Sequence, residues 1–136
     1  MQLFLKVAAG LVTAMFFFLG LSAYFDPAGI LAQGAFAWQP DGIAGLSGAR
    51  SVIGGHFLGL AVVAVYGFMT SQYKLFYVIA VSELLIAGGR FLSLGLDGYD
   101  ARIVAPLIIE LIMAGTMFAC GYLLKSAPVE PAATSH

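Results

Sequence analysis

The chain has 136 residues, of which 61% are hydrophobic and 10% charged, and its formal net charge is −1. Soluble domains are about 45–50% apolar and about 25% charged, so a soluble globular protein of this size is excluded. The lack of a basic tract argues against nucleic acid as a partner. The single cysteine, Cys120, allows no internal disulfide.

Four segments are apolar and long enough to cross a bilayer as helices, which requires roughly 20 apolar residues. They are residues 3–25, 49–71, 73–95 and 102–124. A signal peptide is the alternative for the first segment, but its apolar run is longer than a signal core of about 7–15 residues, so a retained helix is favoured. We therefore predict an all-α membrane protein, a four-transmembrane-helix bundle that forms a single domain over 1–125.

The connection between the first two spans carries its own signals. Asp26 and Pro27 end the first helix, because the residue before proline avoids the α region. The same pair suits the N-cap and first position of a new helix. The apolar stretch 28–38 predicts a short interfacial helix between spans 1 and 2, with Trp38 among the headgroups. Turns are expected over 39–48.

Short turns are expected between the later spans, with Asp100 as the N-cap of the fourth. The Pro- and Ala-rich tail 126–136 is expected to be disordered. Four spans put both termini on one side of the bilayer, together with Lys6, Lys74 and Lys125. Because lysine and arginine near span ends favour the cytoplasm, we predict cytoplasmic termini.

Ionisable residues inside the spans are the main functional signal, since each central charge costs about 2.5–3.5 kcal/mol. Glu83, Arg90 and Asp97 are seven residues apart and therefore share nearly one face of the third span. The predicted intramembrane polar cluster comprises Arg50, His56, Glu83, Arg90 and Glu110, with Asp97 and Asp100 at its rim. We expect Glu83 and Glu110 to neutralise Arg50 and Arg90, and the sequence leaves open which arginine pairs with which glutamate.

Arg50 and His56 each allow more than one interpretation. Arg50 lies in the first turn of its predicted helix, where the macrodipole favours an anion. A carboxylate or bound anion beside it is one interpretation, and snorkelling to the headgroups is the other. His56 is interpreted first as a packing residue, then as a ligand or proton contact, and last as a metal or haem ligand. No metal site is predicted, because no span holds a second histidine.

Small residues and one proline also carry expectations. Gly55 and Gly59 form a G-x-x-x-G pair beside Gly54, and Gly88 and Gly89 precede the third-span arginine. Such glycines let helix backbones approach closely in lipid.

Proline at position 106 removes a helical hydrogen bond in the fourth span. A kink there is expected to open a small cavity near Glu110.

The segments "GLSGARSVIGGHFLGL", "ELLIAGGRFLSLGLDG" and "PLIIELIMA" resemble a family of small four-helix bacterial membrane proteins of unknown function, distantly similar to the DoxX-like group. The resemblance covers about residues 5–124. Its marked positions are Arg50, Gly54, Gly55, His56, Glu83, Gly89, Arg90, Asp97, Gly98 and Glu110. It implies a four-helix bundle in the bacterial inner membrane, and it implies no particular reaction or cofactor.

Three functions are consistent with these features. The favoured one is non-enzymatic: a bundle that packs in a larger membrane complex or homo-oligomer, or that binds a lipid-like molecule. The second is transport or proton transfer through Glu83, His56 and Glu110, acting as an oligomer. The third is an intramembrane enzyme on an isoprenoid or quinone, with His56 and a glutamate as acid and base.

Overall fold

The computed structural model describes residues 1–32, 36 and 39–124. Within them the four predicted spans are confirmed as four helices long and apolar enough to cross a membrane: Gln2–Phe25, Gly42–Met69, Tyr73–Leu96 and Ala101–Leu123. Only 28–39% of the most apolar part of each helix is buried inside the protein. Most of their apolar side chains therefore face outward, as in a multi-pass membrane protein. Trp38, Lys125 and the tail 126–136 lie outside the described residues.

The helices are continuous or compound in different ways. The first is α1 (Gln2–Phe25), followed by a short α2 (Pro27–Ala32). The second span joins α3 (Gly42–Gly48), a π-helical segment η1 (Ala49–Gly54) and α4 (Gly55–Met69). The third is a 3₁₀ turn η2 (Tyr73–Leu75) leading into α5 (Phe76–Leu96), and the fourth is α6 (Ala101–Leu123).

The turns expected over 39–48 are largely wrong, because the second helix begins at Gly42. Glycine disfavours helix by about 1 kcal/mol per residue, which is the reason to expect turns there. Extending an existing helix, however, adds one backbone bond for each residue fixed. Gly42 begins the helix with a positive φ of 59°, and Gly45 N–H donates to the Asp41 carbonyl at 3.0 Å.

Two aspartates cap helices as their sequence positions predict. Gly29 N–H donates to Asp26 Oδ1 at 2.9 Å, and α2 begins at Pro27. Arg102 N–H donates to Asp100 Oδ1 at 2.9 Å at the start of α6. These bonds satisfy backbone donors that would otherwise lack partners. The placement of α2 at a membrane interface stays a prediction.

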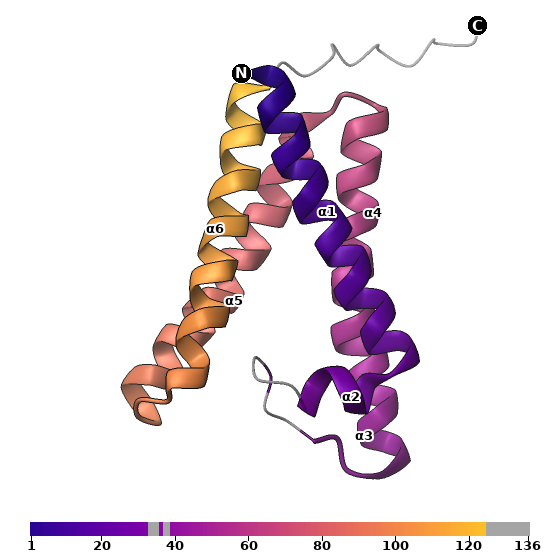
Figure 1. Cartoon of the computed structure of the whole chain (residues 1–136), viewed down its shortest axis with the longest axis vertical. Coiled ribbons are helices and arrows are strands. Elements are labelled where there is room, and N and C mark those ends of the chain that lie inside the picture. The colour runs from indigo at the N-terminus through magenta and orange to yellow at the C-terminus, as the bar shows by residue number, and fades with distance from the viewer. Residues whose placement is uncertain (33–35, 37–38, 125–136) are drawn as a thin grey trace, which may run out of the picture.

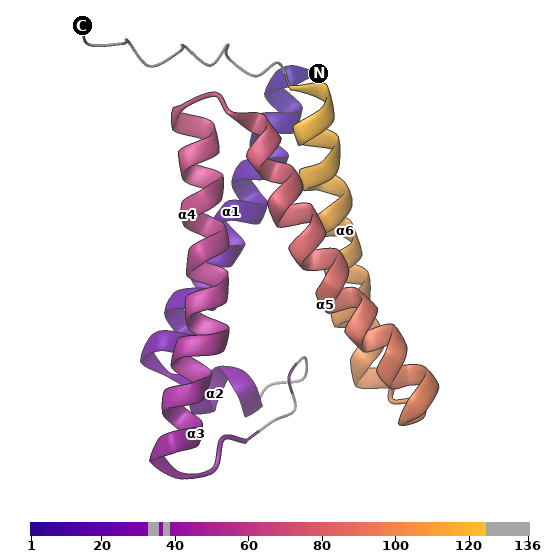
Figure 2. The same ribbon diagram turned by 180° about the vertical axis from the view of Figure 1, so that it is seen from behind.

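The four spans form two arms that meet at one end of the molecule (Figure 1). α1 packs along α4, and α5 packs along α6. The arms converge near the N-terminus and separate toward α2, α3 and the turn between α5 and α6, as both views show (Figure 2). The structure thus has a closed end, where all four spans meet, and an open end, where the two pairs diverge.

An aromatic cluster fills the closed end. Phe68, Tyr73 and Phe76 pack edge to face with ring centroids 5.0–6.3 Å apart, an arrangement that the ring quadrupoles favour. Lys6 Nζ lies 5.6 Å from the Tyr73 ring centroid, within cation–π range. Cys120 is fully buried there, and its Sγ donates to the Leu5 carbonyl at 3.2 Å. These contacts fasten α1, α5 and α6 together.

Glycines bring α1 and α4 together, but not the predicted pair. A Cβ on Gly20 would lie 2.9 Å from the Leu58 backbone nitrogen, and a Cβ on Gly54 would lie 2.5 Å from a Tyr24 ring carbon. The role expected of Gly54 is therefore confirmed. The prediction for the G-x-x-x-G pair is wrong within this chain, because a Cβ on Gly55 or Gly59 would meet no atom within 4 Å.

The same holds for Gly88 and Gly89 before the third-span arginine, where an added Cβ also meets open space. These glycines sit on α5 faces that no described helix covers. Spacing identifies small residues in a helix, but it does not tell which of them face a neighbour.

Candidate functional site

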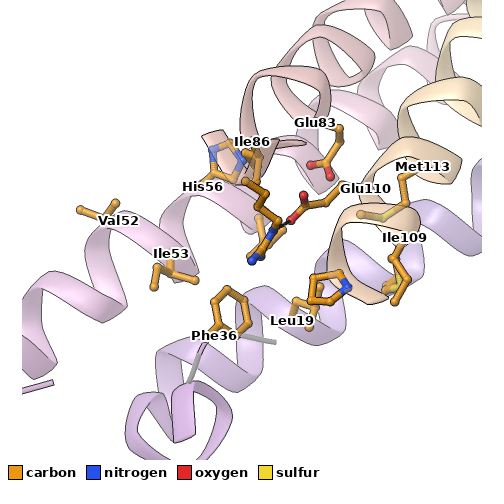
Figure 3. Close-up of a pocket in the computed structure, with 14 residues that line it drawn as sticks. Leu19, Phe36, Val52, Ile53, His56, Glu83, Ile86, Ile109, Glu110 and Met113 are labelled. Atoms are coloured by element: carbon orange, nitrogen blue, oxygen red, sulfur yellow. Dashed lines mark hydrogen bonds and ion pairs between the residues drawn. The ribbon is translucent and has the colours of Figure 1, made fainter. Parts of the chain in front are cut away.

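A cavity of ≈ 460 Å³ lies between the two helix pairs on the side of the open end. This falls within the range of roughly 300–1,000 Å³ for small-molecule pockets. All four spans contribute to its wall, which is mostly apolar (Figure 3). Four of the predicted cluster residues line it, namely His56 from α4, Glu83 and Arg90 from α5, and Glu110 from α6. The cluster therefore borders a cavity.

Of the two expected arginine–glutamate pairs, one is confirmed, and its members are Arg90 and Glu110. Arg90 Nε donates to Glu110 Oε1 at 2.8 Å, and the two side chains are 20% and 9% exposed. A charge-assisted bond at this depth is stronger than a surface pair, because little water screens it. It joins α5 to α6 and leaves the other glutamate oxygen, Oε2, buried without a hydrogen-bond partner in the described part of the chain.

Glu83 is fully buried, and neither of its carboxylate oxygens has a hydrogen-bond partner among the described residues. Buried polar groups are normally paired, since a buried carboxylate without a partner costs several kcal/mol. Its carboxyl group is on the same side of the cavity as Glu110 (Figure 3), close enough for the two acids to repel each other. The expectation that Glu83 neutralises an arginine is therefore wrong.

His56 enters the cavity from the opposite helix pair. It is half-buried, and its ring meets the edge of Phe57 with centroids 5.5 Å apart. Its Nε2 is buried and has no hydrogen-bond partner among the described residues. The packing role is thus present in the Phe57 contact, while the free nitrogen leaves the ligand-contact interpretation open.

Arg50 does not join the cluster, and its predicted pairing with a glutamate is wrong. Its Nε donates to the Tyr24 backbone carbonyl at 2.9 Å, and the residue is exposed. That carbonyl is one of the last in α1, where a helix carries unpaired acceptors and partial negative charge. The expected dipole misfit also disappears, because the helix begins at Gly42, two turns before Arg50.

The two rim aspartates are also outside the cavity wall. Ser93 Oγ donates to Asp97 Oδ2 at 2.6 Å. Asp100 binds the Arg102 guanidinium, with Nη2 to Oδ2 at 2.5 Å. This bond holds the pKa of Asp100 down at about 2. Both acids bond to residues next to the turn between α5 and α6, and neither lines the cavity. The prediction that they form the rim of the cluster is therefore wrong.

Sequence reasoning missed most of the apolar wall and the π-helical segment. The wall includes Met15, Leu19, Ile86 and Met113, whose residue types are ordinary in any span. Pro106 does line the cavity, as expected from its position near Glu110, although its predicted kink stays a prediction. The segment η1 ends just before His56. π-helical turns often occur at functional sites, and they have no compositional signature.

The positive and negative charges of the ionisable groups around the cavity do not balance. Two carboxylates, those of Glu83 and Glu110, face one guanidinium, that of Arg90, and one imidazole, that of His56. Among the described residues, no group of three or more His, Cys, Asp or Glu side chains could hold a metal ion. The arrangement can bind an apolar body and offer hydrogen-bond acceptors at one place on its wall.

Comparison with protein-family models, with curated proteins and with solved structures finds no match to this chain.

Proposed function

We propose that this protein binds an amphipathic, lipid-like molecule in the cavity between its two helix pairs. The observation that carries the proposal is the Glu83 side chain, which is fully buried at an apolar cavity and whose two oxygens have no partner among the residues that the structure describes. A polar group on the ligand would supply the missing partner, and the surrounding apolar side chains would contact its hydrocarbon body. The proposal favours ligand binding over a purely structural role, for which a closed and fully paired cluster is expected.

The proposed setting is the bacterial inner membrane, with both termini in the cytoplasm. The four-helix family resemblance supports the first part, and the lysines at the closed end, Lys6 and Lys74, support the second. A homo-oligomer or a larger membrane complex is proposed as the native assembly, because the outer faces of all four spans are apolar and uncovered.

A photoreactive probe tests this function directly. Dodecanol carrying a diazirine on its chain is added to the purified protein in nanodiscs, illuminated, and mapped by mass spectrometry of the peptides. We expect labelling of cavity residues such as Met113. Ile86→Trp, which fills the cavity from α5, should reduce that labelling several-fold.

Leu85→Trp is the matched control, because it adds the same ring to the next residue of α5, which is 72% exposed. It should leave the labelling of Met113 unchanged. Labelling confined to outward-facing residues, or an equal response of the two tryptophan variants, would show that the cavity is not a binding site.

A further inference from the structure

The charge balance around the cavity narrows the class of ligand, on the premise that the proposed function is correct. Arg90 is committed to Glu110 by the 2.8 Å bond, so it satisfies one carboxylate. Within the described residues, both oxygens of Glu83 lack partners, and Glu110 Oε2 is a third buried acceptor on the same wall. The site therefore has three acceptor oxygens and an excess of one negative charge when both acids are ionised.

Among the described residues, the other groups that face Glu83 do not supply the missing positive charge. α1 contributes only Met15 and Leu19 to the cavity wall, and neither titrates. From α4 comes His56, which forms no ion pair with either carboxylate among the described residues. An isolated carboxylate in an apolar cavity is costly, so the site favours a partner that brings both positive charge and N–H donors.

We propose that the ligand carries a protonated amine, whose ammonium group binds between Glu83 and Oε2 of Glu110 while its apolar body occupies the cavity. A primary ammonium has three N–H donors, which match the three acceptor oxygens. Bonds from a charged donor to a carboxylate are short and strong, and the dry wall around them limits screening by water. An anionic head would meet two carboxylates and is disfavoured.

A matched set of head groups on one hydrocarbon chain tests this inference. Four diazirine-bearing probes are compared at neutral pH: dodecylamine, dodecyltrimethylammonium, dodecanol and dodecanoate. We expect half-maximal labelling of Met113 at an amine concentration about tenfold or more below that for the alcohol. The trimethylammonium probe should fall between them, because it has the charge and lacks the N–H donors. Dodecanoate should label least.

Two substitutions with opposite expected signs keep the test independent of folding. Glu83→Gln has nearly the same shape and should remove most of the preference for the amine over the alcohol. Arg90→Gln removes the cation that neutralises Glu110, and so should increase the preference. Leu85→Gln, which puts the same amide on the exposed side of α5, should change nothing.

The outcomes separate the inference from the function on which it rests. If neither amine nor alcohol labels the cavity, the proposed function fails and the inference fails with it. If both label it equally, or dodecanoate labels it best, the cavity binds ligands but the ammonium inference is overturned. A trimethylammonium probe equal to the amine would overturn the role of the N–H donors.

The ammonium group has two sources, a free lipophilic amine or the headgroup of a membrane lipid. Nanodiscs of phosphatidylcholine alone, and of phosphatidylcholine with phosphatidylethanolamine, distinguish them. Reduced amine labelling in the second kind of disc supports the lipid headgroup as the source. Unchanged labelling supports the free amine.

Discussion

The two ends of the bundle differ in how their polar and aromatic groups are used. At the closed end, Tyr73 and Phe76 are almost completely buried and pack against Phe68 within one aromatic cluster. At the open end, Glu83 is just as buried, and its oxygens have no partner in the described chain. Complete burial therefore accompanies tight packing at one end and an unmet hydrogen-bonding requirement at the other. Under the proposed function, the first end stabilises the bundle and the second end binds the ligand.

The largest expected effect is a loss of stability at the closed end. Phe76→Ala removes a fully buried ring from the aromatic cluster and should lower the free energy of unfolding by about 3–5 kcal/mol. Ile86→Ala lies on the cavity wall and is only partly buried, so it should cost about 1 kcal/mol or less. Unfolding in mixed micelles of increasing denaturing detergent measures both.

Equal losses of unfolding free energy for Phe76→Ala and Ile86→Ala would mean that the open end is packed as tightly as the closed end. That result would contradict the assignment of different roles to the two ends.

A smaller effect is expected where α1 meets α4. Gly20→Ala puts a methyl group 2.9 Å from a backbone nitrogen of Leu58, which cannot rotate away. The helices must separate, at a cost of about 1–3 kcal/mol. Gly59→Ala adds the same methyl group in open space and should be neutral or slightly stabilising. The same unfolding assay checks the pair.

If Gly59→Ala destabilised the protein and Gly20→Ala did not, the assignment of Gly20 to a helix contact and of Gly59 to open space would be reversed. It would indicate that a second copy of the chain packs on the G-x-x-x-G face.

The smallest effect concerns the turn between α5 and α6. The bonds from Arg102 hold the pKa of Asp100 at about 2, below its ordinary value of 3.8. Because the folded-state pKa is depressed, the stabilisation of the α6 N-terminus is present above pH 3.8 and is lost as the pH falls through about 2. The amide chemical shift of Arg102, followed by NMR in micelles, should change with a midpoint near pH 2. Asp100→Asn should abolish this transition, and a midpoint near 4 would contradict the bonded geometry.

Local chemistry and overall hydropathy predicted much of this structure. The four spans follow from apolar runs, and the caps at Asp26 and Asp100 follow from side chains that bond to nearby backbone donors. An arginine–glutamate pair could be expected because opposite charges attract strongly in an apolar layer, although the sequence did not show that Arg90 would be the partner of Glu110. In each case, the determining groups are adjacent in sequence or strongly attracted.

The failures share a different cause. Arg50 bonds to a backbone carbonyl at the end of α1, and an acceptor of that kind has no side chain that a sequence could show. Gly20 and Gly59 look alike in sequence, yet only Gly20 faces another helix. Glu83 has no hydrogen-bond partner among the described residues, a result that depends on the arrangement of all four spans rather than on its own helix.

The π-helical segment has a consequence for the tolerance of the chain to length changes. A π turn accommodates one more residue than an α turn, so deleting a single residue within Ala49–Gly54 could be absorbed by conversion to α-helix. The same deletion between Glu83 and Arg90 falls in a regular α-helix, which has no extra residue to lose. It would rotate one of them by about 100° relative to the other and move one group out of the cavity wall. The second span should therefore tolerate the deletion of one residue in the π-helical segment shortly before His56. The third span should not tolerate a deletion between Glu83 and Arg90.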